Sequence, residues 1–374
     1  MKVLLIGNYG PDRQESMLRY GELMRDGLLD AGHEVTLALP EPVLNRSGRP
    51  ASGLAKWVGY LDKYLFGLGQ IQSLAHAADV VHVCDHSNAV YVPRVSRVPY
   101  VVTCHDLLAV RGARGEDTDC PASFTGRLLQ RQILAGLGRA AAVACVSGAT
   151  RKDATRLLPG YRGQLSVVPN AFNYPYRRLD PQTLSGRLAT LATPLHDRPY
   201  VLNVGSNLRR KNRETLLQAI AIIQTVWPGR LVLAGAPLTP ALWALASSLG
   251  IRDRIVEVVK PDNDLLEALY NGAQSLVFPS RFEGFGWPLI EAQACGCPVI
   301  CSDRDPFPEV TGQAAIFCGA DDVEAYGRAI VELHSDAQRR AGLVRQGLAN
   351  IEAYSRSAMI SQFVSLYDSL GGRR

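Results

Sequence analysis

The sequence predicts an α/β protein of two doubly wound units, each built on its own parallel sheet. Two series of short apolar runs, rich in β-branched residues, alternate with segments of helix length, as in parallel strands joined by right-handed crossovers. A stretch without periodicity separates the two series. The chain has 374 residues, which exceeds the size at which one hydrophobic core usually keeps growing. We therefore expect two full-sized domains.

The first series predicts an N-terminal domain of residues 1–171. Its six strands are expected at Val3–Ile6, Val35–Leu39, Val80–Val83, Tyr100–Cys104, Ala142–Val146 and Leu165–Val168. A linker is expected at residues 172–198, where prolines and arginines cluster.

The second series predicts a C-terminal domain of residues 199–354. Its strands are expected at Tyr200–Val204, Leu231–Gly235, Ile255–Val259, Ser275–Phe278 and Val299–Cys301. After Asp321 the pattern is helical, with helices expected at Val323–His334, Asp336–Tyr354 and Ser357–Leu370. Residues 355–374, which carry the last of these helices, form a separate C-terminal segment. Because open α/β sheets bind ligands at the carboxyl ends of their strands, a site is expected in the segments that follow the strands.

Composition excludes several classes of protein. Hydrophobic residues make up 47% of the chain and charged residues 20%, as in an ordinary soluble globular protein. No run of 18 or more apolar residues occurs, and Met1 and Lys2 lead directly into a predicted strand, so we expect a cytoplasmic protein. The net charge of +5 is compatible with anionic substrates or loose attraction to a lipid surface, and it is too weak to indicate nucleic acid binding.

The eight cysteines indicate neither disulfides nor a metal site. Several lie in or beside apolar strand-like runs: Cys84, Cys104, Cys145 and Cys301. Cys295 and Cys297 are only two residues apart, and no second pair or histidine follows at the spacing of metal ligands. We expect buried, reduced thiols.

A glycine-rich turn after the predicted strand Ser275–Phe278 carries the strongest functional signal. Glu283 and Glu291 flank it, and the glycines at positions 284 and 286 let the backbone approach a ligand at the start of a helix, where an anion is favoured. Carboxylates accept hydrogen bonds from hydroxyl groups, so a diphosphate between two polyols would satisfy the whole segment. The alternative is a solvated acidic residue beside an ordinary helix cap.

A second candidate site follows the predicted strand Tyr200–Val204. The turn Gly205-Ser206-Asn207 precedes the basic pair Arg210 and Lys211, whose side chains are suited to a phosphate, Arg as a fork and Lys as a point charge. A basic helix start on the surface is the alternative, because phosphate sites and solvated charge runs look alike in sequence.

Together these motifs resemble the retaining GT-B glycosyltransferases of family four. The resemblance is carried by E-G-F-G-W-P-L-I-E-A from Glu283, A-C-G-C-P-V-I from Ala294 and V-L-N-V-G-S-N-L-R-R-K-N-R-E-T-L-L from Val201, with P-E-V at 308–310, His105-Asp106 and Val168-Pro169-Asn170. It spans nearly the whole chain. It implies two Rossmann-like domains facing across a cleft, the N-terminal one on the acceptor side, with the final helix packing back on that domain.

The resemblance also implies site residues. The catalytic residues would be His105, Glu283, Arg210 and Lys211. The donor nucleotide-sugar would be bound by Gly205, Ser206, Arg210, Lys211, Val259, Glu283, Gly284, Phe285, Gly286 and Glu291. Val259 occupies the region where relatives contact the nucleobase, and the sequence leaves guanine and uracil open. Many relatives carry an additional arginine where Ser206 stands here, so Arg210 and Lys211 would supply the positive charge. No metal ion or resident cofactor is implied, since the nucleotide-sugar is a co-substrate.

On the acceptor side the resemblance implies Gly10, Ser16, His86 and Asp106. His105 would lie beneath the donor sugar, with Asp106 orienting it. The family's glycine pair in the first loop is replaced here by Glu15-Ser16, which puts the close backbone approach in doubt. His86 and the aspartate before it either touch the acceptor or cap the next helix.

An aromatic stripe at helical spacing runs through the N-terminal half, at Trp57, Tyr60, Leu61, Tyr64, Leu65 and Leu68. Core packing against the sheet is one interpretation, and peripheral contact with the inner membrane face or a lipid-linked acceptor is the other.

The resemblance implies a mannosyltransferase-like hexosyltransferase that moves a sugar from a GDP-mannose-like or UDP-sugar donor to a hydroxyl of a saccharide, lipid-linked or small-molecule acceptor. Polysaccharide or glycoconjugate biosynthesis is the expected setting. An epimerase of the same fold and a noncatalytic nucleotide-sugar-binding protein remain alternatives, and a phosphorylase would need a lysine-bound cofactor. A dinucleotide-dependent oxidoreductase is disfavoured because no G-x-G-x-x-G follows the first strand.

Overall fold

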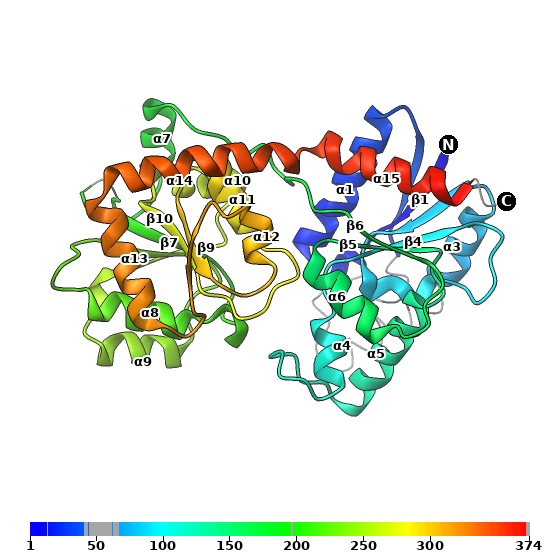
Figure 1. The fold of residues 1–374 in the computed structure, drawn as a ribbon, viewed down its shortest axis with the longest axis horizontal. Helices are drawn as coiled ribbons and strands as arrows, with labels where there is room; N and C mark the ends of the chain where they lie inside the picture. Colours follow the sequence, from blue (N-terminus) through cyan, green and yellow to red (C-terminus); the bar gives the residue numbers. More distant parts are fainter. Residues whose placement is uncertain (13, 41–43, 45–61, 63–66, 196, 372–374) are drawn as a thin grey trace. The chain divides into compact units, whose positions relative to one another are not determined.

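The computed structural model describes residues 1–12, 14–40, 44, 62, 67–195 and 197–371, and it divides the chain into two compact units (Figure 1). Unit 1 comprises Met1–Asn173 and Ser355–Arg374, and unit 2 comprises Tyr174–Tyr354. The segment expected as a linker is therefore assigned largely to unit 2. It contains the helix α7 (Pro181–Leu188), which Asp180 caps through the backbone N–H groups of residues 182 and 183.

In the described part of unit 1 a six-stranded parallel sheet has the order β2-β1-β3-β4-β5-β6. The strands are β1 (Lys2–Ile6), β2 (Glu34–Ala38), β3 (Val80–Val83), β4 (Tyr100–Cys104), β5 (Ala142–Cys145) and β6 (Gln164–Val167). The helices are α1 (Glu15–Asp30), α3 (Gly67–Ala75), α4 (Leu108–Ala113), α5 (Phe124–Leu137), α6 (Gly148–Leu157) and α15 (Arg356–Gly371), with the 3-10 turns η1 (Gly10–Asp12) and η3 (His86–Tyr91). In Figure 1, α1 and α15 cover one face of this sheet, and α4, α5 and α6 lie on the other.

In the described part of unit 2 a second six-stranded parallel sheet has the order β12-β11-β10-β7-β8-β9. The strands are β7 (Tyr200–Gly205), β8 (Arg230–Gly235), β9 (Ile255–Val259), β10 (Ser275–Phe278), β11 (Val299–Ser302) and β12 (Ile316–Cys318). The helices and 3-10 turns besides α7 are η4 (Arg209–Lys211), α8 (Arg213–Ile222), α9 (Pro240–Ser248), η5 (Arg252–Arg254), α10 (Asn263–Gly272), α11 (Trp287–Ala294), α12 (Phe307–Thr311), α13 (Val323–Ser335), α14 (Ala337–Asn350) and η6 (Ile351–Tyr354). The predicted doubly wound fold is confirmed, and β12 is a strand that the sequence patterns missed.

Register brings the segments after the strands to one edge of each sheet. In unit 1, Cys104 pairs with Cys145 and Cys145 with Val167. In unit 2, Gly205 pairs with Gly235 and Gly235 with Val259. The turns that carry most of the predicted site residues therefore lie at the carboxyl edges, where ligands of open α/β sheets bind.

Both sheets are buried in apolar cores, and the strand pattern explains why. Residues of β3, β4, β5, β10 and β11 are buried on both faces, as in parallel sheets covered by helices. All eight cysteines are free thiols, and seven are buried, as expected. The structure has no described helix that combines the length and the apolarity required to cross a membrane.

A buried polar chain fastens α15 to the sheet of unit 1. The ring of His82 on β3 is hydrogen-bonded through Nδ1 to the Tyr367 hydroxyl, 2.5 Å away, and through Nε2 to Thr103 Oγ1, 2.7 Å away. Thr103 also meets the Tyr20 hydroxyl of α1 at 3.1 Å, and the Phe363 ring packs on His82. The chain thus ties α15, β3, β4 and α1 together through groups that are all buried.

This histidine should make the fold sensitive to acid. Burial, helped by repulsion from His105, lowers the pKa of His82 to about 3, while a histidine in an unfolded chain titrates at about 6.5. Below pH 6.5 the unfolded chain therefore binds a proton that the folded chain does not, and stability falls by up to about 1.4 kcal/mol per pH unit. We predict that His82→Gln, although less stable at pH 7, loses less of its free energy of unfolding between pH 6.5 and 5 in urea titrations. Phe363→Leu, which loosens the same packing and keeps the histidine, should lower stability and retain the wild-type slope. Equal slopes for His82→Gln and the wild-type protein would contradict the assignment.

Candidate functional site

The turn after β7 in unit 2 lies against the end of β8. Gly205 has φ +149° and Gly235 has φ +122°, both outside the range that side-chain-bearing residues favour. A Cβ on Gly235 would lie 2.3 Å from the Gly205 carbonyl oxygen, and the Ala236 N–H donates to that oxygen at 3.1 Å. Two glycines are therefore required where the two strand ends meet.

Arg213, at the start of α8, holds this turn in place. Its guanidinium donates to the carbonyl oxygens of Gly205 (2.9 Å) and Ala236 (2.8 Å) and to the side-chain oxygens of Asn207 (2.6 Å) and Asn203 (3.2 Å). Burial lowers the pKa of Arg213 to about 10, so the group remains charged at neutral pH. Sequence reasoning missed this residue, because an arginine at a helix start looks like any solvated cation.

The predicted basic pair lies on η4 and faces Glu283. Arg210 Nη1 is 2.8 Å from Glu283 Oε2, and Lys211 Nζ is 2.5 Å from Glu283 Oε1. Asn212 ends the turn in the left-handed conformation, φ +56°, and its amide donates to the Ala320 carbonyl at 2.7 Å. The structure thus brings together three predicted residues that lie about seventy positions apart in sequence.

Glu283 is ionised in this setting. Burial alone would raise the pKa of its carboxyl, but the charges and hydrogen bonds of Lys211 and Arg210 outweigh burial and lower it. The side chain is only 11% exposed, so both cations lie close to a carboxylate that is largely shielded from solvent.

Glu291 has different surroundings from Glu283. It lies on α11 and is buried, with Oε2 accepting a hydrogen bond from the Tyr270 hydroxyl at 2.8 Å. Burial raises the pKa of Tyr270 strongly, and the Glu291 charge adds to the rise, so the phenol stays protonated and donates. The hydroxyl-accepting role predicted for Glu291 stays a prediction.

The glycine loop between the two glutamates is compact. Gly286, with φ +99°, immediately precedes α11, while Gly284 and Phe285 are buried. The Phe285 ring meets the rings of Trp287 and Tyr354 edge to face at about 6 Å, so this predicted donor residue is part of a packed aromatic cluster.

Val259 and Ser206 complete the predicted donor set at the same sheet edge. Val259 ends β9, is 52% exposed and precedes Lys260, whose N–H donates to the Gly235 carbonyl at 3.0 Å. Ser206 is partly buried in the turn after Gly205. Leu208, which sequence reasoning did not single out, is another exposed apolar side chain just beyond this turn.

In unit 1, His105 follows β4 and is a neutral, fixed ring. Its Nε2 donates to the Cys84 carbonyl at 3.0 Å, and the Tyr20 ring meets it edge to face at 4.7 Å. Burial lowers the pKa of His105, although the nearby Asp85 charge acts in the opposite direction. Imidazole with its proton on Nε2 leaves Nδ1 as a hydrogen-bond acceptor.

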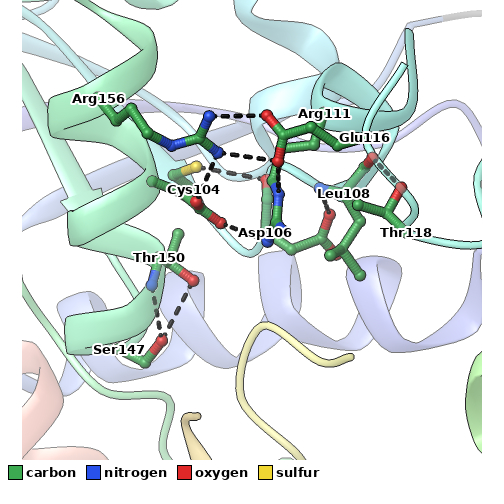
Figure 2. A network of polar contacts seen from close by, with 10 residues as sticks. Cys104, Asp106, Leu108, Arg111, Glu116, Thr118, Ser147, Thr150 and Arg156 are labelled. Carbon is green, nitrogen blue, oxygen red and sulfur yellow. Dashed lines mark hydrogen bonds and ion pairs between the residues drawn. The ribbon is translucent and has the colours of Figure 1, made fainter. Parts of the chain in front are cut away.

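Asp106 has a different contact from the one expected. The prediction is that Asp106 orients His105, but its Oδ1 accepts the Leu108 N–H at 3.0 Å at the start of α4 (Figure 2). The Cys84 carbonyl orients the histidine ring instead. The Cys104 thiol donates to the Asp106 carbonyl at 3.5 Å. Asp106 is the expected partner of His105 because the two are adjacent in sequence. The actual partner, Cys84, follows the neighbouring strand β3 and is distant in sequence.

An ion-pair network holds the segment after Asp106 (Figure 2). Glu116 accepts from Arg111 at 2.8 Å and from Arg156 at 2.7 Å. Asp153 joins both arginines, at 3.0 and 3.1 Å. The network links the segment around α4 to α6.

The first loop and the segment after β3 are tied by Asp85. Its carboxylate accepts from Asn8 Nδ2 (2.7 Å), Ser87 Oγ (2.6 Å) and the Ser87 N–H (3.1 Å), and His86 Nδ1 lies 3.1 Å away. Burial would lower the pKa of His86, but the bond to Asp85 outweighs burial and raises it. Asp85 therefore caps η3. Gly10 and Ser16 are both exposed beyond β1, and their acceptor role stays a prediction.

The described residues thus form two separate sets. In unit 2, Gly205, Arg210, Lys211 and Glu283 lie at one sheet edge. In unit 1, His105 bonds to the segment after β3, which Asp85 links to the loop after β1. No group of three or more His, Cys, Asp or Glu side chains in the described ranges is placed to hold a metal ion.

Comparison with known proteins finds two families along the chain. Residues 19–174 match the family described as Glycosyltransferase Family 4, and residues 198–336 match the one described as Glycosyl transferases group 1. O-antigen chain mannosyltransferase B of Escherichia coli is 34% identical over 177 residues, 46% of this chain and 46% of that protein, so this match spans less than half of the relative's length. D-inositol 3-phosphate glycosyltransferase of Corynebacterium glutamicum (strain R) is 27% identical over 287 residues, 73% of this chain and 67% of that protein.

Solved structures show the same fold. Sucrose-phosphate synthase from Thermosynechococcus elongatus has a TM-score of 0.77 at 22% identity, covering 100% of both chains. Anabaena HepE in complex with UDP has a TM-score of 0.75 at 15% identity, covering 99% of this chain and 100% of that one. WaaG, a glycosyltransferase involved in lipopolysaccharide biosynthesis, has a TM-score of 0.71 at 15% identity, covering 98% and 99%. The fold is GT-B, as the motifs predicted.

The contact between the two glycines should be intolerant of a side chain. We predict that Gly235→Ala lowers the free energy of unfolding by about 2 to 4 kcal/mol in urea titrations, because the new methyl group meets the Gly205 carbonyl at an unfavourable φ. Gly186→Ala is the control, since a Cβ there meets nothing within 4 Å inside α7, and it should be neutral or stabilising by up to about 1 kcal/mol. Equal stability of Gly235→Ala and wild type would contradict this account.

Proposed function

Because residues 19–174 match Glycosyltransferase Family 4 and residues 198–336 match Glycosyl transferases group 1, we propose that this protein is a glycosyltransferase. It transfers a hexosyl group from a nucleoside-diphosphate sugar to an acceptor hydroxyl with retention of configuration. The observation that carries the proposal is the convergence of Arg210, Lys211 and Glu283 beside the Gly205 turn. Fixed cations, a hydroxyl-accepting carboxylate and close backbone suit a diphosphate joined to a sugar.

The proposed chemistry needs charge stabilisation above all. The bond between the anomeric carbon and the phosphate oxygen breaks, and its electron pair leaves with the nucleoside diphosphate. The acceptor oxygen forms the new bond on the same face, and its proton passes to the departing phosphate oxygen. Arg210 and Lys211 would stabilise the charge that develops on the diphosphate, and preorganised groups of this kind often make the largest catalytic contribution. No metal ion or resident cofactor enters the proposal.

His105 would assist as a neutral hydrogen-bonding group. Burial lowers its pKa and Nε2 donates to the Cys84 carbonyl, so the ring is neutral and its orientation is fixed. Gly10, Ser16, His86 and Asp106 remain the proposed acceptor-side residues.

The donor is proposed to be GDP-mannose-like or a UDP-sugar. The mannosyltransferase relative supports the first and the UDP complex of HepE the second. The O-antigen enzyme also supports a polysaccharide or glycoconjugate setting, and we propose that transfer takes place in the cytoplasm.

Transfer is tested by incubating the protein with a panel of UDP- and GDP-sugars, with and without saccharide and lipid-linked acceptors, while nucleoside diphosphate release and the anomeric configuration of the product are followed. Acceptor-dependent release supports transfer. Binding without turnover would favour a noncatalytic nucleotide-sugar-binding protein, and isomerised nucleotide-sugar would favour an epimerase. If the protein binds none of the donors and releases no nucleoside diphosphate from them, the proposal is overturned.

Within that assay, Lys211→Ala should reduce kcat/KM by about 100-fold or more, because a charge facing the leaving group is lost. Thermal unfolding should show that the variant is still folded, because Arg210 continues to pair with Glu283. Arg209→Ala is the matched control, an exposed cation on the same turn, and it should change kcat/KM only a few-fold. A wild-type rate for Lys211→Ala would remove the site assignment.

Peripheral membrane contact is a further part of the proposal, and α5 supports it. The stripe predicted between Trp57 and Leu68 lies outside the side chains that the structure describes. On α5, however, Phe124 is 84% exposed and Leu128, one turn on, is 54% exposed. Arg127 and Arg131 are exposed beside them, and the sequence contains no acidic residue from Cys120 to Lys152. Apolar side chains bordered by arginines without acids suit an anionic lipid surface.

The double variant Phe124→Ser, Leu128→Ser should therefore bind at least about five-fold less to vesicles of phosphatidylglycerol and phosphatidylcholine in cosedimentation. The control is Ile222→Ser, Val226→Ser, which removes two exposed apolar side chains from unit 2 and should bind like wild type. Wild-type protein should prefer these vesicles to pure phosphatidylcholine. Equal binding of both double variants would contradict a role for α5.

A further inference from the structure

Glu283 is the counter-ion of both cations that are proposed to hold the donor diphosphate. Its two carboxylate oxygens are divided between them, Oε2 toward Arg210 at 2.8 Å and Oε1 toward Lys211 at 2.5 Å. All three side chains are less than one-fifth exposed, so solvent screens the interaction only weakly. A diphosphate that binds these cations must share them with Glu283 or displace it.

The two cations are fixed more firmly than by Glu283 alone. Arg210 Nη1 also donates to the Phe282 carbonyl at 3.0 Å, and the Arg210 carbonyl accepts the Arg281 N–H at 2.7 Å. Lys211 Nζ lies 5.1 Å from the centre of the Phe278 ring, a cation–π distance. Loss of the Glu283 charge should therefore leave the cations in place and uncompensated.

The negative charge of Glu283 should affect the binding of the nucleotide-sugar and of the released nucleoside diphosphate differently. Two cations and one carboxylate give the cluster a net charge of +1, against at least two negative charges on a diphosphate. With the sugar-bearing donor, a displaced carboxylate can accept hydrogen bonds from sugar hydroxyls. With a nucleoside diphosphate alone it has no such hydroxyls, and a partly buried carboxylate beside a phosphate is unfavourable.

We propose that Glu283 is a specificity residue that disfavours the released nucleoside diphosphate relative to the nucleotide-sugar, by competing with the diphosphate for Arg210 and Lys211 unless a sugar is attached. This inference rests on the proposed function. It is a repulsive element built into the donor site, and such elements commonly set specificity between similar ligands. Its kinetic consequence is faster product release, a step that often limits turnover.

The variant Glu283→Gln keeps the size and the hydrogen-bonding capacity of the side chain and removes its charge. The wild-type and variant proteins are titrated calorimetrically with UDP, GDP, UDP-glucose and GDP-mannose. For the nucleoside diphosphate that the wild-type protein binds, the variant should bind at least about five-fold more tightly. Its affinity for the matching nucleotide-sugar should be unchanged or weaker, so the preference for the sugar-bearing form should fall. Product inhibition should strengthen by a similar factor.

Two further variants keep the result interpretable. Glu283→Ala should also bind the nucleoside diphosphate more tightly, which guards against misfolding of the glutamine variant. Glu267→Gln alters another buried glutamate of unit 2, whose carboxylate pairs with Arg187 at 2.6 Å, and it should leave both affinities unchanged.

The outcomes separate this inference from the function on which it rests. Wild-type protein that binds neither UDP nor GDP nor their sugars would overturn both proposals. The other outcome is that wild-type protein binds a nucleoside diphosphate and the folded Glu283 variants bind it equally or more weakly. That result would overturn the role of Glu283 and leave the proposed function standing.

Discussion

The approach of two strand ends, Gly205 on β7 and Gly235 on β8, is the constraint on which the site in unit 2 depends. Because the backbones nearly touch there, the turn after β7 has little freedom, and Arg213 removes more of it by binding carbonyls on both sides. The next residues then form one tight turn that ends at Asn212. Backbone geometry positions the basic pair, and Glu283 is the counter-ion of both side chains.

Buried charges are handled differently in the two units. In unit 2, cations and a carboxylate are concentrated at one sheet edge, where burial and pairing act against each other on the pKa of Glu283. In unit 1, His82 and His105 are kept neutral by burial, while Asp85 and His86 stabilise each other as an ion pair. Unit 2 therefore concentrates its charges at one sheet edge, whereas unit 1 combines neutral buried imidazoles with a single His–Asp pair.

Sequence patterns predicted features that are local in the chain. The strand series, the glycine turns and the basic pair each depend on neighbouring residues, and the two sheets and the GT-B fold confirm that interpretation. Features that depend on distant partners were missed. The pairing of Glu283 with both cations, the grip of Arg213 on the Gly205 turn and the Cys84 carbonyl under His105 all join separate strands. The strand β12 was missed because three residues are too few for a periodic signal. The helix α7 was missed because eight residues among prolines resemble a linker.

The return of α15 to unit 1 also bears on how the chain is made. Unit 2 is one continuous stretch, whereas the core of unit 1 includes Phe363 and Tyr367, which are synthesised after the whole of unit 2. Domains generally fold in order of synthesis, the N-terminal one first. Here the polar chain through His82 lacks Tyr367 until all of unit 2 has been synthesised. Unit 2 can therefore complete its fold before unit 1. Unit 1 begins synthesis first but completes its core only when α15 is added.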